Sequence, residues 1–549
     1  MRVLGISPAH DASVCVLNDG VVERFYKEER LSKKKRDNYP YLSLLEVHKE
    51  FGTDIDFIVV SSPTPNTFPD LEHFCSKLFN RKVEFVCQHH HLQHASLAFY
   101  SSGFDRALTF VVDRNGSNFK EYFRESETVF FCDYPNNFTE VYKSFWRMNV
   151  GDEKLYNLLN QLKEQNPHCE FVCDSNFNIT KVYESATTLI SEHPLENGKT
   201  MGLSSYGKDK KFYDLFDESI PKDKYFTHLT KDHHPEMEVS VFKEYDSKTS
   251  DGVYKEDYQF YADYAYQVQK QSQEAVGDLI EKYSSNYATD NICITGGYGL
   301  NVLANSYYKK RFPNLNFFYE PLADDTGNSI GCALLKYHQE TNTCKKFDMQ
   351  GTFFHGINHK IPERFSHCNE DFIVDCILDQ KSVAVYNGMA ESGPRALGNR
   401  SILFDCRNKD SRDIVNKIKN REWYRPFAAI CIEDDAKILF DYQSDENAKY
   451  MTMSFKANLD FADVIPGVLH VDGTCRIQVV DHDHHLFSLL EKIKSRIGYG
   501  ILLNTSFNLA GDPLVETVSD ALNVLENSDL DIIWFPETNQ YVERGDESN

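Results

Sequence analysis

The sequence contains no long hydrophobic run, and this absence argues against membrane-spanning helices. None of its 549 residues belongs to an apolar stretch of about eighteen residues, the least that a membrane-spanning helix needs. The first residues, MRVLGISPAHDAS, lack the basic and then apolar layout of a secretory signal peptide. We therefore expect a cytoplasmic protein that does not bind membranes, and the host cytoplasm if the chain is viral.

Paired cysteines and positive charge are also scarce. The 14 cysteines include no Cys-x-x-Cys pair and no regular spacing, so nothing indicates a disulfide framework. Most lie inside apolar runs such as SVCVL and NICIT, which is typical of packed, reduced thiols. The net charge of -24 argues against a protein that coats nucleic acid, although a local basic groove would not show in a total.

Strand and helix patterns alternate along the chain, with no low-complexity segment and no repeat of solenoid period. This alternation is typical of the α/β class. Helical periodicity is lost at residues 338–352, which we interpret as a linker. We therefore expect one domain at residues 1–345 and a second at residues 346–549.

Two stretches repeat the same strand–turn–strand design. The first runs from RVLGISP through the turn AHDAS to VCVLNDG and VVERFYKEE, which are predicted to be short strands of a meander. The second, ALTFVVDRNGSNFKEYF at 107–123, again places a polar turn after an apolar strand. Because each turn carries an aspartate, Asp11 and Asp113, the two stretches predict a duplicated half-domain.

Four histidines crowd into the segment QHHHLQHASLAFY. The preceding KVEFVC is predicted to be a buried strand, and Ala95–Tyr100 the apolar part of a helix. On a helix, His90 and His94 lie one turn apart on one face and can share a cation, whereas His89 and His91 point elsewhere. The alternative is a polar helix start that binds nothing, so the pair indicates a metal only if a further ligand exists.

Asp325, in EPLADDTGNSIGCALL, is the candidate for that ligand. It precedes a small-residue helix entry, where a carboxylate can reach a cation at the helix start. Its alternative role is to cap the helix.

A strand, a glycine turn and a helix follow one another in NICITGGYGLNVLANSYY. Gly296 and Gly297 let the backbone approach a ligand closely, and the helix after them offers free N–H groups to a phosphate. A tight turn without a ligand is the alternative. Together with HDAS and DRNGS, however, this is the third polar loop after a strand, and actin-like and sugar-kinase-like folds hold ATP between two lobes with such loops.

Nine motifs now carry a resemblance to a known family. They are VLGISPAHDASVCVLNDG, EERLSKKK, HHLQHASLAFY, GKTMGLSSYGK, GGYGLNV, ESGPRALGNRSIL, IKNREWYRPFAA, HVDGTCRIQVV and LLNTSFNLAGDPLV. In this order they resemble the motifs of the nodulation-protein-U and cephamycin/tobramycin O-carbamoyltransferase family, from about residue 3 to residue 535.

The resemblance implies two domains and two half-reactions. The N-terminal domain would have the actin-like (ASKHA) fold of the tRNA threonylcarbamoyladenosine synthases, and the C-terminal domain would be YrdC-like. In that family, the C-terminal domain converts carbamoyl phosphate and ATP into carbamoyl-adenylate. The N-terminal domain then passes the carbamoyl group to an acceptor hydroxyl.

The resemblance also assigns site residues in the N-terminal domain. His90, His94 and Asp325 match the family's metal ligands, which bind Fe²⁺ or another divalent metal. His10 is the candidate base for the acceptor hydroxyl, with Lys35 as an electrostatic helper. The sequence departs from the family here, since the family's usual Lys-His pair is Lys35-Arg36. The expected nucleotide-binding residues of this domain are Asp11, Asp113, Gly116, Gly296, Gly297 and Asn301.

The C-terminal motifs are rich in cationic donors, which carbamoyl-adenylate formation requires because two polyanions must be held together. GPRALGNR supplies Arg395 and Arg400, and NTSFN resembles the Ser-x-Asn nucleotide contact of YrdC-like domains. Solvated surface charges and a plain Asx/Ser turn are the alternatives. The expected ligands of carbamoyl phosphate and ATP are Arg395, Lys419, Arg421, Arg425, Arg476, Ser506 and Asn508, with Lys419 and Arg425 also catalytic.

The expected co-substrates are carbamoyl phosphate and ATP with Mg²⁺. We expect the acceptor to be a sugar-like or antibiotic-like small molecule, or a hydroxymethylated pyrimidine as a nucleotide or in DNA, and the protein to be a possible homodimer. An ATP-dependent small-molecule kinase of the actin-like fold is the first alternative, and ADP instead of AMP as product would favour it. A noncatalytic nucleotide-binding module is the second.

Overall fold

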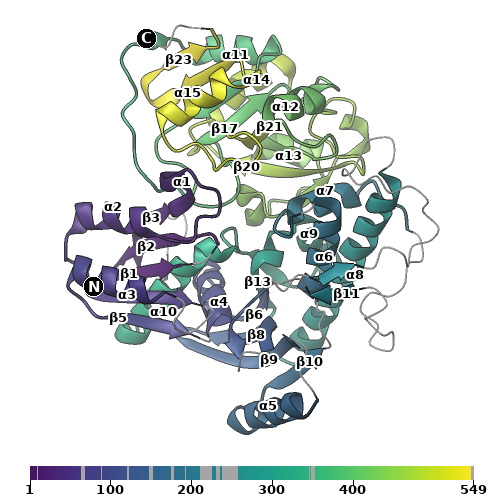
Figure 1. The fold of residues 1–549 in the computed structure, drawn as a ribbon. Helices are drawn as coiled ribbons and strands as arrows, with labels where there is room; N and C mark the ends of the chain where they lie inside the picture. The colour runs from purple at the N-terminus through teal and green to yellow at the C-terminus, as the bar shows by residue number, and fades with distance from the viewer. Residues whose placement is uncertain are drawn as a thin grey trace. The chain divides into compact units, whose positions relative to one another are not determined.

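The computed structural model divides the chain into two compact units, and each is considered by itself (Figure 1). Unit 1 comprises Met1–Ala9, Ser13–Glu23 and Leu44–Asp348, and unit 2 comprises His10–Ala12, Arg24–Ser43 and Met349–Asn549. The structure describes residues 1–8, 10–62, 68–87, 89–119, 123–147, 152–174, 179–191, 193–209, 226–229, 235–237, 258–344, 346–347 and 353–545.

The first sheet is formed by the meander that the sequence predicts and by two further strands. Its strand order is β3-β2-β1-β4-β5, in which β1 pairs antiparallel with β2 and parallel with β4, and β4 pairs parallel with β5. The strands are β1 (Arg2–Ser7), β2 (Ser13–Asn18), β3 (Val21–Lys27), β4 (Phe57–Ser62) and β5 (Val83–Cys87).

The second sheet repeats this topology. Its order is β10-β9-β8-β6-β13-β14, where β6 pairs antiparallel with β8 and parallel with β13, and β13 pairs parallel with β14. The predicted duplication is therefore confirmed at the level of strand order. The strands are β6 (Arg106–Val112), β8 (Phe123–Asp133), β9 (Asn137–Arg147), β10 (Glu170–Asp174), β13 (Asn291–Thr295) and β14 (Asn316–Tyr319), with the short β7 (Asn118–Phe119) paired to β8.

Two helices fill the space between the sheets of unit 1 (Figure 1). Helix α10 (Asn328–Thr341) packs on β1, β2 and β4, helix α4 (His90–Ser101) packs on β6 and β13, and the two helices pack on each other. Glycines allow these elements to pack closely. A Cβ atom on Gly5 would lie 1.9 Å from the carbonyl oxygen of Ser329, and a Cβ atom on Gly331 would lie 2.2 Å from the carbonyl oxygen of Gln93. Larger residues would separate the layers.

The remaining elements of unit 1 surround this double-sheet core. The helices are α2 (Tyr41–Phe51), α3 (Pro69–Phe79), α5 (Asp152–Gln165), α6 (Ile179–Ser191), α7 (Asn197–Ser204), α8 (Gln259–Ser284) and α9 (Val302–Arg311). Two short strands, β11 (Phe226–Leu229) and β12 (Pro235–Met237), pair antiparallel with each other. No helix in the described ranges is both long and apolar enough to cross a membrane.

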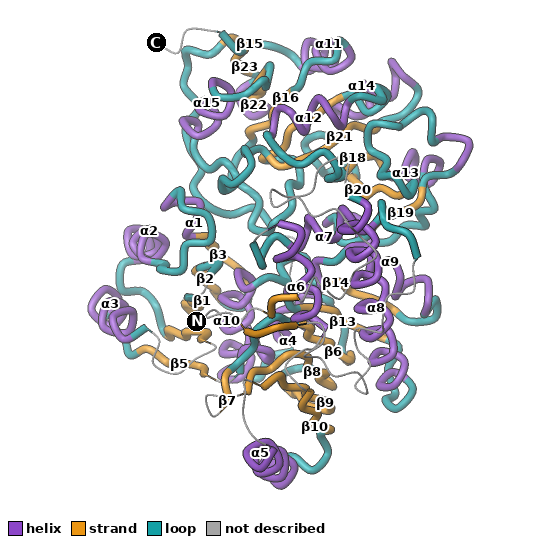
Figure 2. Tube along the Cα trace, turned by 45° about the vertical axis from the view of Figure 1, so that its right-hand side comes forward, coloured by secondary structure: helices purple, strands orange, loops and turns teal. Residues whose placement is uncertain are grey.

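Unit 2 contains a nine-stranded mixed sheet with helices on both faces (Figure 2). Along β16, Val383 and Val385 pack under α11 and α14, while Ala384 and Tyr386 face α15, which is the alternation expected of a strand buried on both sides. The strand order is β15 (Ser366–His367), β23 (Gln540–Glu543), β22 (Ile532–Phe535), β16 (Val383–Tyr386), β17 (Arg400–Phe404), β21 (Ile501–Ser506), β18 (Ala428–Ile432), β20 (Thr474–Val480) and β19 (Ser454–Lys456); the helices are α11 (Glu370–Leu378), α12 (Ser411–Lys419), α13 (Glu433–Leu439), α14 (Phe487–Ile497) and α15 (Val518–Glu526).

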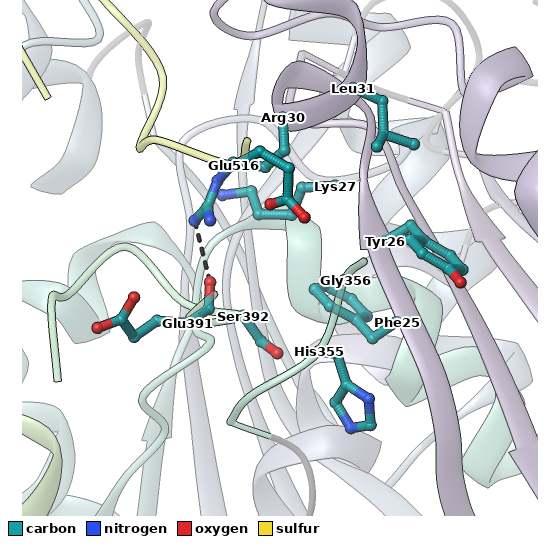
Figure 3. Close-up of a pocket in the computed structure, with 10 residues that line it drawn as sticks. All are labelled: Phe25, Tyr26, Lys27, Arg30, Leu31, His355, Gly356, Glu391, Ser392 and Glu516. Atoms are coloured by element: carbon teal, nitrogen blue, oxygen red, sulfur yellow. Dashed lines mark hydrogen bonds between the residues drawn. The ribbon is translucent and has the colours of Figure 1, made fainter. Parts of the chain in front are cut away.

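An N-terminal segment, residues 24–43, is part of unit 2 and contains the last four residues of β3 as well as helix α1 (Glu28–Ser32). The buried Arg30 donates hydrogen bonds to the carbonyl oxygens of Glu391 at 3.0 Å and Gly393 at 3.5 Å, of which the first is drawn in Figure 3. Nothing in the local pattern of these residues predicts such a long-range contact. The domain bounds expected from the sequence stay a prediction, because a division by contacts does not test independent folding.

Candidate functional site

Four side chains of unit 1 converge on one point. Helix α4 begins at His90, so His90 and His94 lie on one face with their Nε2 atoms 3.3 Å apart. Each Nε2 is 3.3 Å from Oδ1 of Asp325, and Oδ2 of Asp113 lies 3.5 Å from Nε2 of His90. One ligand atom from each of the four residues lies within 4.8 Å of the other three.

The electrostatics of this cluster favour positive charge. Burial alone would lower the pKa of His90, but Asp325 and Asp113 outweigh burial and raise this pKa to about 10. Burial would likewise raise the pKa of Asp113, yet the hydrogen bond with His90 holds it well below its usual value. The buried carboxylate of Asp113 and the half-buried one of Asp325 therefore favour a positive charge at this point, on the imidazole or on an ion.

The glycine turn after β13 holds one of the carboxylates. The backbone N–H of Gly297 donates to Oδ1 of Asp113 at 3.1 Å. Gly296 has a φ of 80°, and a Cβ there would lie 2.5 Å from the carbonyl oxygen of Val112, so only glycine fits. The turn thus orients Asp113 toward His90.

The other two histidines have different roles, as predicted. His91 is fully buried, its Nδ1 lies 2.8 Å from the hydroxyl of Thr128, and burial lowers its pKa to about 4. A Cβ on Gly116 would lie 2.5 Å from Nε2 of His91, which explains a glycine there without a nucleotide. His89 is exposed at the start of α4.

The donor set fits a divalent transition metal. Two imidazole nitrogens and two carboxylate oxygens suit Fe²⁺ or Zn²⁺ better than Mg²⁺, which prefers oxygen alone. The sequence interpretation assigned Asp113 to the nucleotide, whereas the structure places it in this cluster. Asp325 directs its carboxylate to His90 and His94, and α10 begins only at Asn328, whose amide nitrogen lies 3.1 Å from Nε2 of His94.

The remaining nucleotide candidates are dispersed. Asn301 is buried, caps α9 by accepting the N–H of Ala304 at 3.1 Å, and exchanges two hydrogen bonds with Gln269. His10 and Asp11 belong to unit 2, where Nε2 of His10 lies 3.7 Å from Oδ2 of Asp11.

Unit 2 brings Lys419 together with the NTSFN motif. The ammonium group of Lys419, at the end of α12, donates to the Ser506 carbonyl, to the Ser506 hydroxyl at 3.1 Å, and to the carbonyl and side-chain oxygens of Asn508 at 2.9 and 3.0 Å. Lys419 is 3% exposed, so these hydrogen bonds are shielded from solvent. The Asn508 N–H also donates to the Ser506 carbonyl, so the turn considered as an alternative is present too.

The other predicted cations surround Lys419. Burial, Arg421 and Arg425 lower the pKa of Lys419 well below its usual value, and Lys35 contributes in the same direction. Burial and Arg425 also depress the pKa of Arg421, and they lower that of Arg476 to about 10. The lowered pKa of Lys419 indicates that these cations lie near one another; Lys419 is buried, and Arg421, Arg425 and Arg476 are half-buried. A group of cations in a partly enclosed region is what a polyanion site requires.

The predicted arginine ligands of unit 2 differ in their burial and in the hydrogen bonds that fix their side chains. Arg421 donates to Asn416 and to the Pro426 carbonyl, both at 2.8 Å, whereas Nε of Arg476 is buried and has no hydrogen-bond partner among the described residues. Arg395 is half-buried. Arg400 is fully buried and donates to backbone carbonyls, including that of Asn387 at 2.8 Å, so it shapes the fold.

Sequence models of one family match both parts of the chain. The carbamoyltransferase N-terminus matches residues 70–334, and the carbamoyltransferase C-terminus matches residues 374–541. The chain belongs to the carbamoyltransferase family. The cluster of His90 and Asp325 lies in the first match, and the cations around Lys419 lie in the second.

Individual proteins support this assignment. The carbamoyltransferase is 27% identical to an uncharacterized protein of Methanocaldococcus jannaschii over 97% of this chain and 98% of that one. It is 23% identical to the nodulation protein NolNO of Sinorhizobium fredii over 95% and 77% of the two chains. The solved structure of T. kodakarensis HypF is 12% identical, with a TM-score of 0.37 over 62% of this chain and 48% of that one, and this level carries no conclusion about function.

Proposed function

We propose that this enzyme is an ATP-dependent O-carbamoyltransferase that divides two half-reactions between its units. The observation that carries the proposal is the separation of two kinds of site. Lys419 is buried and its neighbours Arg421, Arg425 and Arg476 are half-buried, and such a group of cations suits anionic substrates. The cluster of His90, His94, Asp113 and Asp325 suits a metal.

The first half-reaction is assigned to unit 2. Carbamoyl phosphate and water give carbamate and phosphate; a carbamate oxygen then attacks the α-phosphorus of ATP, and the bond to pyrophosphate breaks. The products are carbamoyl-adenylate, pyrophosphate and phosphate. Lys419 and Arg425 would stabilise the charge that develops on the transferring oxygens, and Ser506 and Asn508 hold the Lys419 ammonium group in place.

Other cations of unit 2 would bind the two anions. Arg395, Arg421 and Arg476 supply guanidinium groups, of which Arg476 has a buried nitrogen without a hydrogen-bond partner among the described residues. Guanidinium groups match phosphate oxygens in geometry and keep their charge when buried. Mg²⁺ would accompany ATP.

The second half-reaction is assigned to unit 1. The acceptor hydroxyl attacks the carbonyl carbon of carbamoyl-adenylate, the bond to AMP breaks, and the hydroxyl proton is lost. A divalent metal bound by the four-residue cluster would polarise the carbonyl or orient the nucleotide phosphate. The turn at Gly296 and Gly297 remains the candidate phosphate contact of unit 1, although the Gly297 N–H already donates to Asp113. His10 and Lys35, the candidates for removing the proton, belong to unit 2, so their assignment to this step stays a prediction.

The finer fold assignment rests on topology. Unit 1 contains two sheets of the same strand order with two helices between them, which supports an actin-like, duplicated fold. Unit 2 contains one mixed sheet covered on both faces, which is compatible with a YrdC-like domain.

The acceptor is a hydroxyl group. We propose a sugar-like or antibiotic-like small molecule or a hydroxymethylated pyrimidine as its source. The test is mass spectrometry of a panel of these acceptors after incubation with ATP, carbamoyl phosphate and Fe²⁺. A gain of one carbamoyl group on one acceptor supports the proposal, and a gain of phosphate on any of them contradicts it.

A further inference from the structure

A second group of cationic side chains lies in unit 1, beside the candidate metal cluster. Arg114 directly follows Asp113, and the hydroxyl of Thr180 donates to the Asp113 carbonyl oxygen at 2.9 Å. Lys181, the next residue of α6, and Arg114 both pair with the carboxylate of Glu184, and Nζ of Lys181 lies 2.8 Å from its Oε2. The turn that supplies one residue of the metal cluster therefore also supplies the first cation of this group.

Arg124 is the third cation. It lies on β8 directly opposite Trp146 of β9, and cross-strand partners direct their side chains to the same face of a sheet. Nζ of Lys181 lies 4.6 Å from the centre of the Trp146 ring, so Lys181 approaches that face as well. Arg124 is half-buried, makes no ion pair within the described ranges, and has a buried Nε without a hydrogen-bond partner among the described residues.

The three cations are close enough to repel one another. Burial lowers the pKa of Arg124, and the nearby Arg114 lowers it further. Burial also lowers the pKa of Lys181 to about 8, with Arg114 and Arg124 acting in the same direction and Glu184 opposing them. A bound anion would offset both the burial of these charges and their repulsion.

The group is partly open to solvent, which distinguishes it from an ion-pair network sealed in a core. The Arg114 side chain is 23% exposed, whereas those of Lys181 and Glu184 are 0% and 2% exposed. Two guanidinium groups at a partly exposed site suit a phosphate ester, because guanidinium groups match phosphate oxygens in geometry and keep their charge when buried.

We propose that Arg114, Arg124 and Lys181 bind a phosphate group of the acceptor, so that the enzyme carbamoylates a hydroxyl of a phosphorylated small molecule. The inference rests on the proposed function, because it concerns the acceptor of the second half-reaction. Of the acceptors proposed above, it selects a hydroxymethylated pyrimidine nucleotide, since these cations would not attract an uncharged sugar and would repel an antibiotic with amino groups.

A free nucleotide fits this group better than DNA does. A 5′-monophosphate carries about two negative charges at neutral pH, whereas each phosphate of DNA carries about one. The net charge of -24 also opposes the approach of a polyanion. Carbamoyl-adenylate brings another phosphate to unit 1, so the experiment has to separate the two phosphates.

The test measures carbamoyl transfer from synthetic carbamoyl-adenylate, with Fe²⁺ present, to 5-hydroxymethyl-2′-deoxycytidine and to its 5′-monophosphate. The variants are Arg124→Gln and the charge-retaining Arg124→Lys. Arg311→Gln is the matched control, because Arg311 is half-buried elsewhere in unit 1 and paired with Asp278 at 2.7 Å. Circular dichroism and thermal unfolding verify that each variant is folded.

We expect the wild type to have a KM for the monophosphate about tenfold or more below its KM for the nucleoside. Arg124→Gln should raise KM for the monophosphate about tenfold or more and leave KM for the nucleoside within about twofold. Arg124→Lys should restore part of the loss, and Arg311→Gln should change neither value.

Three results would overturn the inference. They are a wild type that does not prefer the monophosphate, an Arg124→Gln variant in which KM for both acceptors rises equally or stays unchanged, and a rise in KM for carbamoyl-adenylate at saturating acceptor. The last result would assign the cations to the adenylate. Failure of the proposed function is distinct, since the wild type would then release no pyrophosphate from ATP in response to carbamoyl phosphate.

Discussion

Asp113 joins the glycine turn of unit 1 to the histidine cluster. Its Oδ1 accepts the N–H of Gly297 at 3.1 Å, and its Oδ2 lies 3.5 Å from Nε2 of His90. One carboxylate therefore contacts both the backbone of the glycine turn and the group of side chains suited to a metal. The turn positions a residue of the candidate metal site.

Asp113→Asn separates the two contacts. The amide oxygen still accepts the Gly297 N–H, but the negative charge opposite His90 is lost. We expect the variant to fold and its affinity for Fe²⁺ to fall about tenfold or more. Metal titration of the purified protein measures this, and an unchanged affinity would remove Asp113 from the ligand set.

His90→Ala and Asp325→Ala should abolish metal binding and carbamoyl transfer while pyrophosphate release from ATP and carbamoyl phosphate persists. The reason is that the cations assigned to the first half-reaction lie in the other unit. Metal analysis of the purified variants, together with separate assays of pyrophosphate release and carbamoyl transfer, measures these effects. Asp324→Asn is the control, since Asp324 bonds to Thr326 rather than to the cluster. Equal loss of both half-reactions would contradict the division.

Lys419→Ala, Arg425→Ala and Ser506→Ala should each abolish carbamoyl-adenylate formation with the metal still bound. Loss of one charge-assisted contact to a transferring oxygen costs about 3 kcal/mol, on the order of a hundredfold in rate. Lys417→Ala is the matched control, because Lys417 lies on the same helix but is exposed and paired with Asp529 at 2.8 Å. Synthetic carbamoyl-adenylate should restore transfer by the three variants, and folded variants that it does not rescue would refute this intermediate.

Glu320 should make stability depend on pH. Burial raises the pKa of its carboxyl from 4.5 to about 7. Between these values the unfolded chain has lost the proton and the folded chain keeps it. Stability is therefore fully present below pH 4.5 and falls as the pH rises toward 7, by up to about 1.4 kcal/mol per pH unit.

Urea unfolding at a series of pH values, with a chelator present, tests this dependence. Glu320→Gln carries no titrating proton, so the difference in unfolding free energy between wild type and variant should change across this interval. Parallel curves for the two proteins would show that the carboxyl titrates normally in the folded state.

Much of unit 1 could be predicted because its signals are local. The strand, glycine turn and helix at 291–308 are present as β13, the turn at Gly297 and α9. The spacing of His90 and His94 places them on one helical face, since α4 begins at His90. Periodicity and turn chemistry determine such features within a few residues.

Features that depend on contacts between residues far apart in the sequence could not be predicted, because no local sequence pattern indicates them. Asp113 follows β6, and only the pairing of β6 with β13 brings it to Gly297. Arg30 lies 361 residues before Glu391, so no pattern near EERLS predicts that this segment belongs to unit 2. Asn301, expected to bind a nucleotide, caps α9, because a short polar side chain before a helix fits either role.

The most direct test of the account is the nucleotide product formed by the wild-type enzyme with ATP, carbamoyl phosphate, Mg²⁺, Fe²⁺ and an acceptor. Chromatography with ³¹P NMR separates AMP and pyrophosphate from ADP. The account predicts AMP and pyrophosphate in equal amounts, both dependent on carbamoyl phosphate. Formation of ADP with a phosphorylated acceptor would contradict it and indicate a kinase.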